Sequence, residues 1–317
     1  MRTLLIILFF PLTVFSQSLS ADIQYLIQQK KYSEAEQIAK EYLDKHPEDL
    51  KIIELLGDSY GHQRDWDNAM SYYKKLVELD PSNANFHYKY GGALGMKALT
   101  ISKLQALSLL SDLKSSFLKA AELDPEHIDA RWALVELYMQ LPGIVGGSKK
   151  KSLKYANELE ALSKVDGYLA KGYIYEYDDE PVKAEQYYKK AIEIGGSITC
   201  YDELSSFYEN NNQPSQAIST LEDSYQKHNK NALHYQIGKV CADYNIQLEK
   251  GERCLKNYIK NYSAKDGVPI EWAYFRLAQI YKNKEDKKEA LIWIDKALHT
   301  RADFEQALEE RKKILQL

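Results

Sequence analysis

The sequence predicts an all-α fold in which about eight helical hairpins stack into a solenoid that ends in a capping helix. One observation is a pattern of large and small residues that recurs about every 34 residues, which is typical of repeat proteins. A second is that the large apolar residues in each interval recur at helical spacing, so each helix has an apolar stripe. One such hairpin cannot bury its apolar face alone, so neighbouring hairpins must stack.

The composition agrees with a folded helical protein and excludes several other classes. The 317 residues are 44% hydrophobic and 28% charged, as in globular proteins. Eight prolines and 15 glycines are too few for a disordered or turn-rich β chain. The net charge of −4 lacks the basic excess that nucleic-acid binding requires. Three cysteines are too few for a disulfide scaffold.

The first segment, residues 1–16, is interpreted as a secretory signal peptide. Arg2 precedes an apolar run of about a dozen residues, whereas a transmembrane helix needs roughly 20. Val14 and Ser16 supply the small residues that a signal peptidase reads, and the junction is similar to that of some Gram-negative bacteria. A retained membrane anchor is the alternative. The sequence therefore predicts a bacterial, exported protein, periplasmic or secreted, whose mature domain is residues 17–317.

The repeated pattern has a fixed order of side chains. A large residue, a small residue and a Tyr lie on a first helix. Alanine and an aromatic residue follow on a second helix, which an Asp-Pro pair ends because Pro cannot continue a helix. In one unit these residues are Leu56, Gly57, Tyr60, Ala69, Tyr73, Asp80 and Pro81. The small residues are expected where the two helices of a hairpin touch most closely; they include Gly57, Ala69, Gly172, Ala184, Ala217 and Ala290.

This order of residues resembles the tetratricopeptide repeat, and the resemblance covers nearly all of residues 17–317. It implies a right-handed stack in which the first helix of each unit lines a concave surface. The sequence departs from the family pattern where Pro is missing from several later units and where Cys241 replaces a Tyr. An amphipathic stretch from Phe304 to Leu315 is expected to form the capping helix.

The third unit is ten residues too long, because Gly91 to Pro125 is 34 steps whereas Gly57 to Pro81 is 24. The surplus falls within residues 97–112, and we expect it to lengthen both helices of this unit. The longer hairpin is either a ridge that touches a partner or additional packing surface.

The fourth unit carries a Gly-rich loop, Pro142–Ser148, before three lysines. Its spacing does not fit a phosphate-binding loop, and the element before it is a helix rather than a strand. We expect a structural loop with Ser148 as the N-cap of the next helix. Contact with an anion or an acidic peptide is the alternative.

Motifs for chemistry are absent from the sequence, which predicts no enzyme, no cofactor and no metal site. No two of the seven histidines stand four residues apart as in helical zinc proteases, and no Gly-x-Ser-x-Gly elbow occurs. Cys241 and Cys254 fall on the two helices of one hairpin. A disulfide is possible after export, but free buried thiols are favoured because Cys241 takes a core position.

The family resemblance places the partner-binding surface on the first helices, three residues before and one residue after the small residue. The candidates are Tyr88, Trp132, Glu136, Tyr173, Asp202, Tyr235, Lys239, Phe275 and Gln279. Tyr and Trp give a large contact area with few torsions to freeze. The alternative is that these aromatics pack against neighbouring helices. The family's Lys and Asn clamp for a terminal carboxylate is missing.

The sequence thus predicts a non-catalytic scaffold that binds a protein or peptide in its groove, and that binds no nucleic acid. A structural subunit of an envelope or secretion assembly and a helical carbohydrate- or small-molecule-binding protein are the alternatives. The fold does not decide among them.

Overall fold

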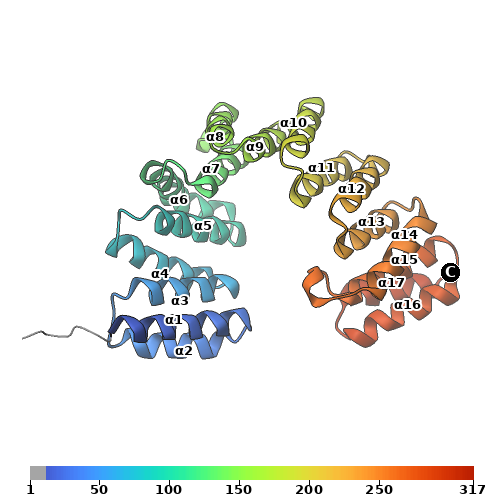
Figure 1. Ribbon diagram of the computed structural model, residues 1–317, viewed down its shortest axis with the longest axis horizontal. Coiled ribbons are helices and arrows are strands. Elements are labelled where there is room, and N and C mark those ends of the chain that lie inside the picture. The colour runs from blue at the N-terminus through green and yellow to red at the C-terminus, as the bar shows by residue number, and fades with distance from the viewer. Residues whose placement is uncertain (1–11) are drawn as a thin grey trace, which may run out of the picture. The chain divides into compact units, whose positions relative to one another are not determined.

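The structure, a computed structural model, describes residues 12–317, with side chains from residue 19 onwards. Over this range it contains seventeen α-helices, two short 3₁₀ helices and no strand. Sixteen of these α-helices form eight successive antiparallel hairpins, and the last helix follows them (Figure 1). The predicted all-α hairpin solenoid is therefore confirmed. Residues 1–11 of the predicted signal peptide lie outside the described residues.

The chain divides into two compact units, Met1–Leu162 and Ser163–Leu317, here called unit 1 and unit 2. Each unit holds four hairpins. The helices of unit 1 are α1 (Leu12–Gln28), α2 (Tyr32–Leu43), α3 (Leu50–His62), α4 (Trp66–Leu79), α5 (Ala84–Thr100), α6 (Lys103–Leu123), α7 (Ile128–Gln140) and α8 (Lys149–Leu162). Those of unit 2 are α9 (Lys164–Tyr177), α10 (Pro181–Ile194), α11 (Ile198–Asn210), α12 (Pro214–His228), α13 (Asn231–Asp243), α14 (Leu248–Lys260), α15 (Ile270–Asn283), α16 (Lys287–Thr300) and α17 (Glu305–Leu315).

Side-chain caps begin many of the first helices. Asp49 accepts hydrogen bonds from the backbone N–H groups of Lys51 and Ile52 at the start of α3, at 3.1 and 3.2 Å. Asn83 caps α5 in the same way. Such a cap satisfies N–H groups that lack a partner within the helix.

The turn inside a hairpin repeats its geometry. In five hairpins the residue two positions before the second helix has φ between 54° and 62°. These residues are Lys30, Arg64, Asp179, Asn212 and Glu285. Only two of them are Asn or Asp, the non-glycine types that tolerate left-handed backbone best. The stacking of the two helices therefore imposes this turn on varied side chains.

The two helices of a hairpin touch where the sequence predicts. A Cβ atom at Gly172 of α9 would lie 2.6 Å from ring carbons of Tyr188 in α10. At Gly91 of α5 the same atom would lie 2.8 Å from the ring of Phe117 in α6. The predicted alanines Ala69, Ala184, Ala217 and Ala290 are fully buried. The repeat pattern therefore sets the helix contacts.

The third hairpin is long in both helices, as predicted. Helix α5 has 17 residues, whereas the first helices α3, α7, α9, α11, α13 and α15 have 13 or 14. Helix α6 has 21 residues, whereas the other second helices have 12 to 15. Ser102 begins α6 with a capping box, in which its hydroxyl and the side chain of Gln105 bond to each other's backbone N–H. The surplus thus extends both helices and the turn between them.

The Gly-rich loop of unit 1 contains a 3₁₀ helix at Gly143–Val145. The Ser148 hydroxyl accepts a hydrogen bond from the backbone N–H of Lys151 at 3.3 Å, so Ser148 is the N-cap of α8, as predicted. The backbone N–H of Ser148 donates to the Tyr138 carbonyl at 2.8 Å. These bonds tie the loop to the end of α7.

Helix α17 covers the end of unit 2. Phe304, Ala307 and Ile314 are fully buried against the last hairpin. The carboxylate of Glu310 is also buried and pairs with Lys282 of α15. Two of the helix's apolar residues, Leu308 and Leu315, are 41% and 48% exposed. The capping helix therefore buries one narrow face.

Candidate interaction surface

The nine predicted binding residues lie on first helices, those of α5, α7, α9, α11, α13 and α15. The structure does not bring all of them to an open surface. Whether a partner can reach a candidate depends on the exposure of its side chain, on its contacts with other rings and on its ion pairs. For the carboxylates it depends also on their hydration.

In unit 1, Tyr88 of α5 and Trp132 of α7 are half-buried. The Tyr88 ring packs on His127 with 5.1 Å between centroids and on Phe117 with 6.0 Å. Burial raises the pKa of the Tyr88 phenol, and the nearby carboxylates of Asp129 and Glu136 raise it further. The surface here therefore combines aromatic rings with negative charge.

Glu136 completes this group in unit 1. Glu136 is solvent-exposed. It makes no hydrogen bond or ion pair with the residues from 19 onwards. Enough protein surrounds the carboxyl group to remove part of its hydration, which raises its pKa above the ordinary value. A carboxylate that has lost water without gaining a partner is favourable to a cation.

In unit 2 the corresponding candidates are Tyr173 of α9 and Asp202 of α11. Both are half-buried, and the Tyr173 ring lies 6.0 Å from that of Tyr177. Burial raises the pKa of the Asp202 carboxyl group. Within the described part of the chain Asp202 has neither a hydrogen bond nor an ion pair.

Tyr235 and Phe275 are core residues, so the expectation that they face an open groove is wrong. They are 6% and 5% exposed. The ring of Tyr235 packs on Tyr258 with 5.5 Å between centroids, and that of Phe275 on Phe304 with 5.4 Å. Neighbouring helices cover both rings, which is the usual fate of aromatics at helical spacing.

Lys239 and Gln279 belong to a chain of polar contacts across three first helices. Lys239 pairs with Glu209 of α11 at 2.8 Å and with Asp243 at 3.4 Å. Arg276 of α15 pairs with Asp243 and donates to the Gln279 side-chain oxygen at 2.8 Å. Neutralisation inside the protein leaves these groups less available to a partner.

Arg276 and Lys89 are the residues that the sequence reasoning missed. Lys89 of α5 lies 2.7 Å from carboxylates of both Glu54 and Asp58 in α3. In both places a base pairs with an acid about one repeat earlier in the chain. A base and an acid separated by about one repeat length in the sequence would have predicted these ion pairs.

The possible metal ligands and the cysteines of the described residues are features on which the sequence makes a prediction. From residue 19 on, no group of three His, Cys, Asp or Glu side chains is arranged to hold a metal ion. The three cysteines are free, and burial raises the pKa of Cys241 to about 12. A thiol with so high a pKa is a poor nucleophile near neutral pH.

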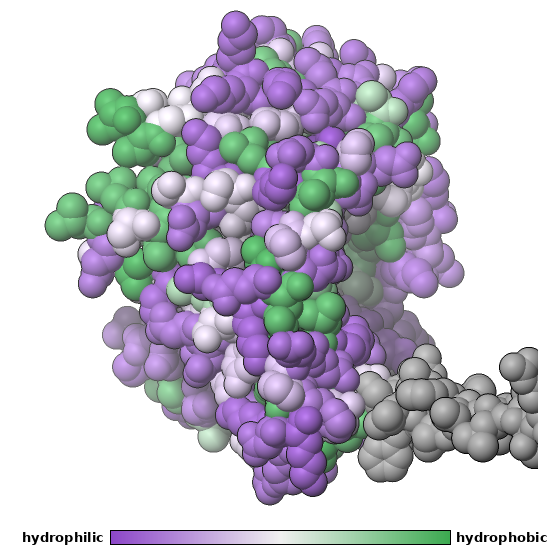
Figure 2. All heavy atoms as spheres, turned by 90° about the vertical axis from the view of Figure 1, so that its left-hand side faces the viewer, coloured by the Kyte–Doolittle hydropathy of each residue, from purple (hydrophilic) through white to green (hydrophobic). Residues whose placement is uncertain are grey.

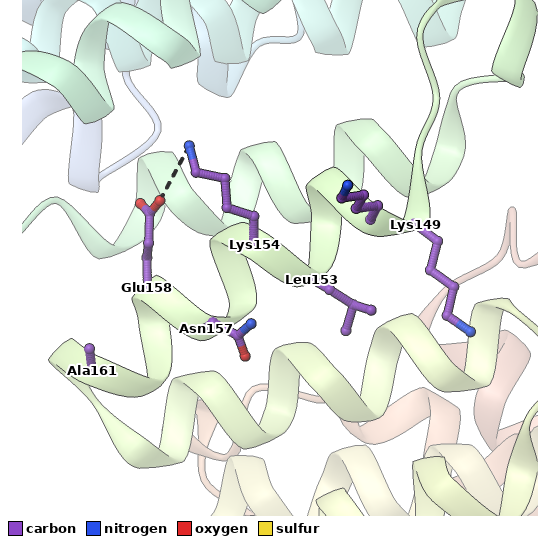
Figure 3. A pocket seen from close by; sticks show the side chains of 7 residues that line it. Lys149, Leu153, Lys154, Asn157, Glu158 and Ala161 are labelled. Carbon is purple, nitrogen blue, oxygen red and sulfur yellow. Dashed lines mark ion pairs between the residues drawn. The ribbon is translucent and has the colours of Figure 1, made fainter.

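One open depression, of about 780 Å³, lies along α8 (Figure 3). Every residue that lines it comes from this helix, among them Lys149, Leu153 and Asn157. The pair of Lys154 with Glu158, at 3.6 Å, crosses part of it. Because a single helix lines it, this is a surface hollow rather than a cavity that could enclose a substrate.

No helix within residues 12–317 is long and apolar enough to cross a bilayer.

Comparison with known proteins relates part of the chain to a known repeat. Models of the tetratricopeptide repeat match residues 23–84, 165–194 and 273–304. The chain is 21% identical over 276 residues to the human protein O-mannosyl-transferase TMTC3. That alignment covers 81% of this chain, which spans only 28% of the relative's length.

A solved structure shows the same fold. A tetratricopeptide repeat protein from Parabacteroides merdae ATCC 43184 superposes with a TM-score of 0.54 at 13% identity, covering 94% of this chain and 98% of that one. TTC0263, a thermophilic tetratricopeptide protein from Thermus thermophilus, has a TM-score of 0.49 at 16% identity, covering 61% of this chain and 97% of that one. The protein is thus a solenoid of tetratricopeptide-type hairpins, an architecture typical of protein-interaction scaffolds.

Proposed function

We propose that this tetratricopeptide-repeat chain is a non-catalytic scaffold, and that the first-helix face of its units binds a protein or peptide through basic side chains. The observation that supports the proposal most is the pair of carboxylates Glu136 and Asp202. Both are partly dehydrated, and neither has a hydrogen-bond or ion-pair partner among the described residues. Each lies on a face that also presents aromatic rings.

The contrast with neighbouring charges supports this choice. Carboxylates of α3 and α11 on the same kind of face are neutralised by bases of the next hairpin, as Glu54 is by Lys89 and Glu209 by Lys239. Glu136 and Asp202 have no such base. A lysine or arginine of a partner would supply the missing charge, and a half-exposed ring beside it adds cation–π attraction.

Rigid helices lower the cost of binding. The helices and their contacts exist before a partner arrives, so little ordering free energy is lost on the protein's side. Tyr88, Trp132 and Tyr173 each have few torsions to immobilise. Affinity would therefore come from preorganised shape and from compensated charge.

A peptide-binding experiment tests the proposal. Two pools of fluorescent peptides of equal length and apolar content are titrated, one rich in lysine and arginine, the other with glutamate in their place. The basic pool should bind, and Glu136→Gln with Asp202→Asn should weaken it by about tenfold or more, as expected for loss of a charge-assisted contact. Glu305→Gln with Glu309→Gln is the matched control, since both residues are exposed acids on α17.

Two results would contradict the proposal. One is equal binding of both pools, which would leave the carboxylates without a role. The other is an equal loss of binding in the control variant. The loss would then come from the change in net charge and not from the two carboxylates.

We also propose that the chain is exported and cleaved after Ser16, as its first sixteen residues suggest. Mass spectrometry of protein recovered from the periplasm or medium of an expressing Gram-negative host should give a chain that starts at Gln17. A chain that keeps Met1 and sediments with the inner membrane would support the retained anchor instead.

A further inference from the structure

The long α5–α6 hairpin exposes a set of aliphatic side chains that the binding face described above does not use. Figure 2 shows hydrophobic side chains that project at one edge of a largely hydrophilic face. We call the following five residues the apolar ridge. They are Met96 (43% exposed), Leu99 (75%), Leu104 (80%), Leu107 (48%) and Ile144 (97%).

The ridge residues come from two segments of unit 1, the tip of the α5–α6 hairpin and the loop before α8. Ile144 lies in the loop before α8, and Lys114 of α6 reaches that loop, with its ammonium 3.8 Å from where a Cβ of Gly146 would lie. Lys114 and Lys151 both stand over the Tyr138 ring, at 5.8 and 5.3 Å from its centroid. The loop and α6 therefore meet around Tyr138.

Lysines outnumber acids near the ridge, although Asp112 of α6 is an exposed acid and Lys89 is neutralised by Glu54 and Asp58. Residues 81–111 contain no Asp or Glu and three lysines, and residues 137–157 contain no Asp or Glu and four lysines, in a chain whose net charge is −4. Lys97 is neutralised by Asp67 at 2.6 Å. Lys103 and Lys150 are exposed and have no ion pair among the described residues.

Aliphatic side chains bordered by lysines fit the surface of an anionic membrane. Apolar residues that stand clear of a protein enter the boundary between headgroups and acyl chains, while lysines beside them attract anionic lipids. The ridge projects rather than forming a groove. A lipid layer needs no matching shape, whereas a protein partner would need a cleft that accepts Leu99, Leu104 and Ile144 together.

We propose that the apolar ridge inserts shallowly into the interface of a membrane that contains anionic lipids, and that Lys103, Lys150 and Lys151 hold the headgroups. This attachment is peripheral and reversible. None of the nine candidate binding residues belongs to the ridge, and attachment would place the scaffold at a membrane surface.

Vesicle co-sedimentation of the full chain tests this proposal. The vesicles are phosphatidylcholine alone, or phosphatidylcholine with an equal amount of phosphatidylglycerol. The protein should sediment with the anionic vesicles only, and added salt should weaken this binding because it screens the lysines. Leu99→Ser with Leu104→Ser should weaken it by about tenfold or more, since two leucines no longer leave water.

A matched variant separates the ridge from exposed apolar area in general. Val182→Ser with Ile194→Ser removes two aliphatic residues of α10 that are 69% and 55% exposed. It should bind anionic vesicles as the unchanged chain does. Lys150→Gln with Lys151→Gln should reduce the preference for anionic over neutral vesicles, and all variants should keep the same circular dichroism.

Three results would overturn the proposal. The unchanged chain could show no preference for anionic vesicles. The ridge variant could bind them as well as the unchanged chain, which would place attachment elsewhere, for example in residues 1–16. Light scattering could show a dimer that the ridge variant converts to a monomer, which would assign the ridge to a second copy of the chain.

Discussion

The α5–α6 and α9–α10 hairpins carry the same repeat but differ in what they present to their surroundings. In both, a glycine of the first helix lies under an aromatic ring of the second, Gly91 under Phe117 and Gly172 under Tyr188. Helix α6 has 21 residues and α10 has 14. The shared part is the contact that closes the hairpin, and the different part lies beyond it.

The residue two positions before each glycine also differs between the two hairpins. In α9 it is Ala170, which is fully buried. In α5 it is Lys89, which reaches back to Glu54 and Asp58 of α3. Stacking of hairpins therefore tolerates either a small apolar residue or an ion pair here, whereas the glycine–aromatic contact admits no extra atom.

Breaking the shared contact should have the largest effect. Gly172→Leu should lower the free energy of unfolding by about 1–3 kcal/mol, because the new side chain overlaps the Tyr188 ring. Chemical denaturation measures this difference. An unchanged midpoint would mean that α9 and α10 do not touch at this residue.

Removing the ion pair that distinguishes α5 should have the next largest effect. Lys89→Gln leaves Glu54, whose side chain is 15% exposed, with the exposed Lys51 as its only remaining base and a 3.4 Å hydrogen bond from Asn85. We expect a loss of about 1–2 kcal/mol at neutral pH. Lys51→Gln is the matched control and should cost less than about 0.5 kcal/mol, since that lysine is 54% exposed.

The pH dependence of this effect follows from the pKa of Glu54. Burial acts to raise that pKa, but the ammonium groups of Lys89 and Lys51 outweigh burial and lower it below its ordinary value of 4.5. A lowered carboxyl pKa stabilises the fold above the ordinary value, and this stabilisation is lost as the pH falls through the lowered one. The difference between the unchanged chain and Lys89→Gln should therefore shrink below pH 4.5. A difference that stays constant down to acid unfolding would contradict the pairing.

Two adjacent glycines of α5, Gly91 and Gly92, should respond to alanine in opposite ways. A Cβ at Gly91 would meet Phe117, whereas a Cβ at Gly92 meets nothing within 4 Å. Gly92→Ala should stabilise the protein by about 0.5–1 kcal/mol through helix propensity. Gly91→Ala should destabilise it by about 1 kcal/mol because the overlap outweighs that gain. Thermal unfolding of both variants tests the opposite signs.

The extension of the third hairpin should matter least for stability. Leu99→Ser with Leu104→Ser changes side chains that are 75% and 80% exposed, so the free energy of unfolding should stay within about 0.5 kcal/mol. A larger loss in denaturation would show that the ridge supports the hairpin and is not available for attachment.

Most of the fold could be predicted because the repeat pattern depends on contacts between residues that are close in the sequence. Small residues such as Gly172 and Ala184 mark where helices touch, and a surplus of ten residues could only lengthen the hairpin that carries it. The hairpin turns could not be predicted in detail. Their left-handed residues include Lys30 and Glu285, whose types do not favour that backbone.

Less of the candidate site could be predicted. Counting from the small residue placed all nine candidates on first helices, but it could not separate Tyr173, which is half-buried, from Tyr235, which is core. Both are tyrosines near a small residue of a first helix. Their difference depends on which rings of neighbouring helices reach them, and the spacing along one helix does not contain that information.

The sequence by itself determined the number of hairpins, their order and the long third unit, because an apolar stripe and a close helix contact depend on residues within one interval. Only the tertiary structure decided which charges are neutralised and which side chains stay in water. Lys239 meets Glu209, whereas Asp202 meets no base among the residues that the structure describes. The physical reason is that hydration and ion pairing depend on atoms brought together from different hairpins.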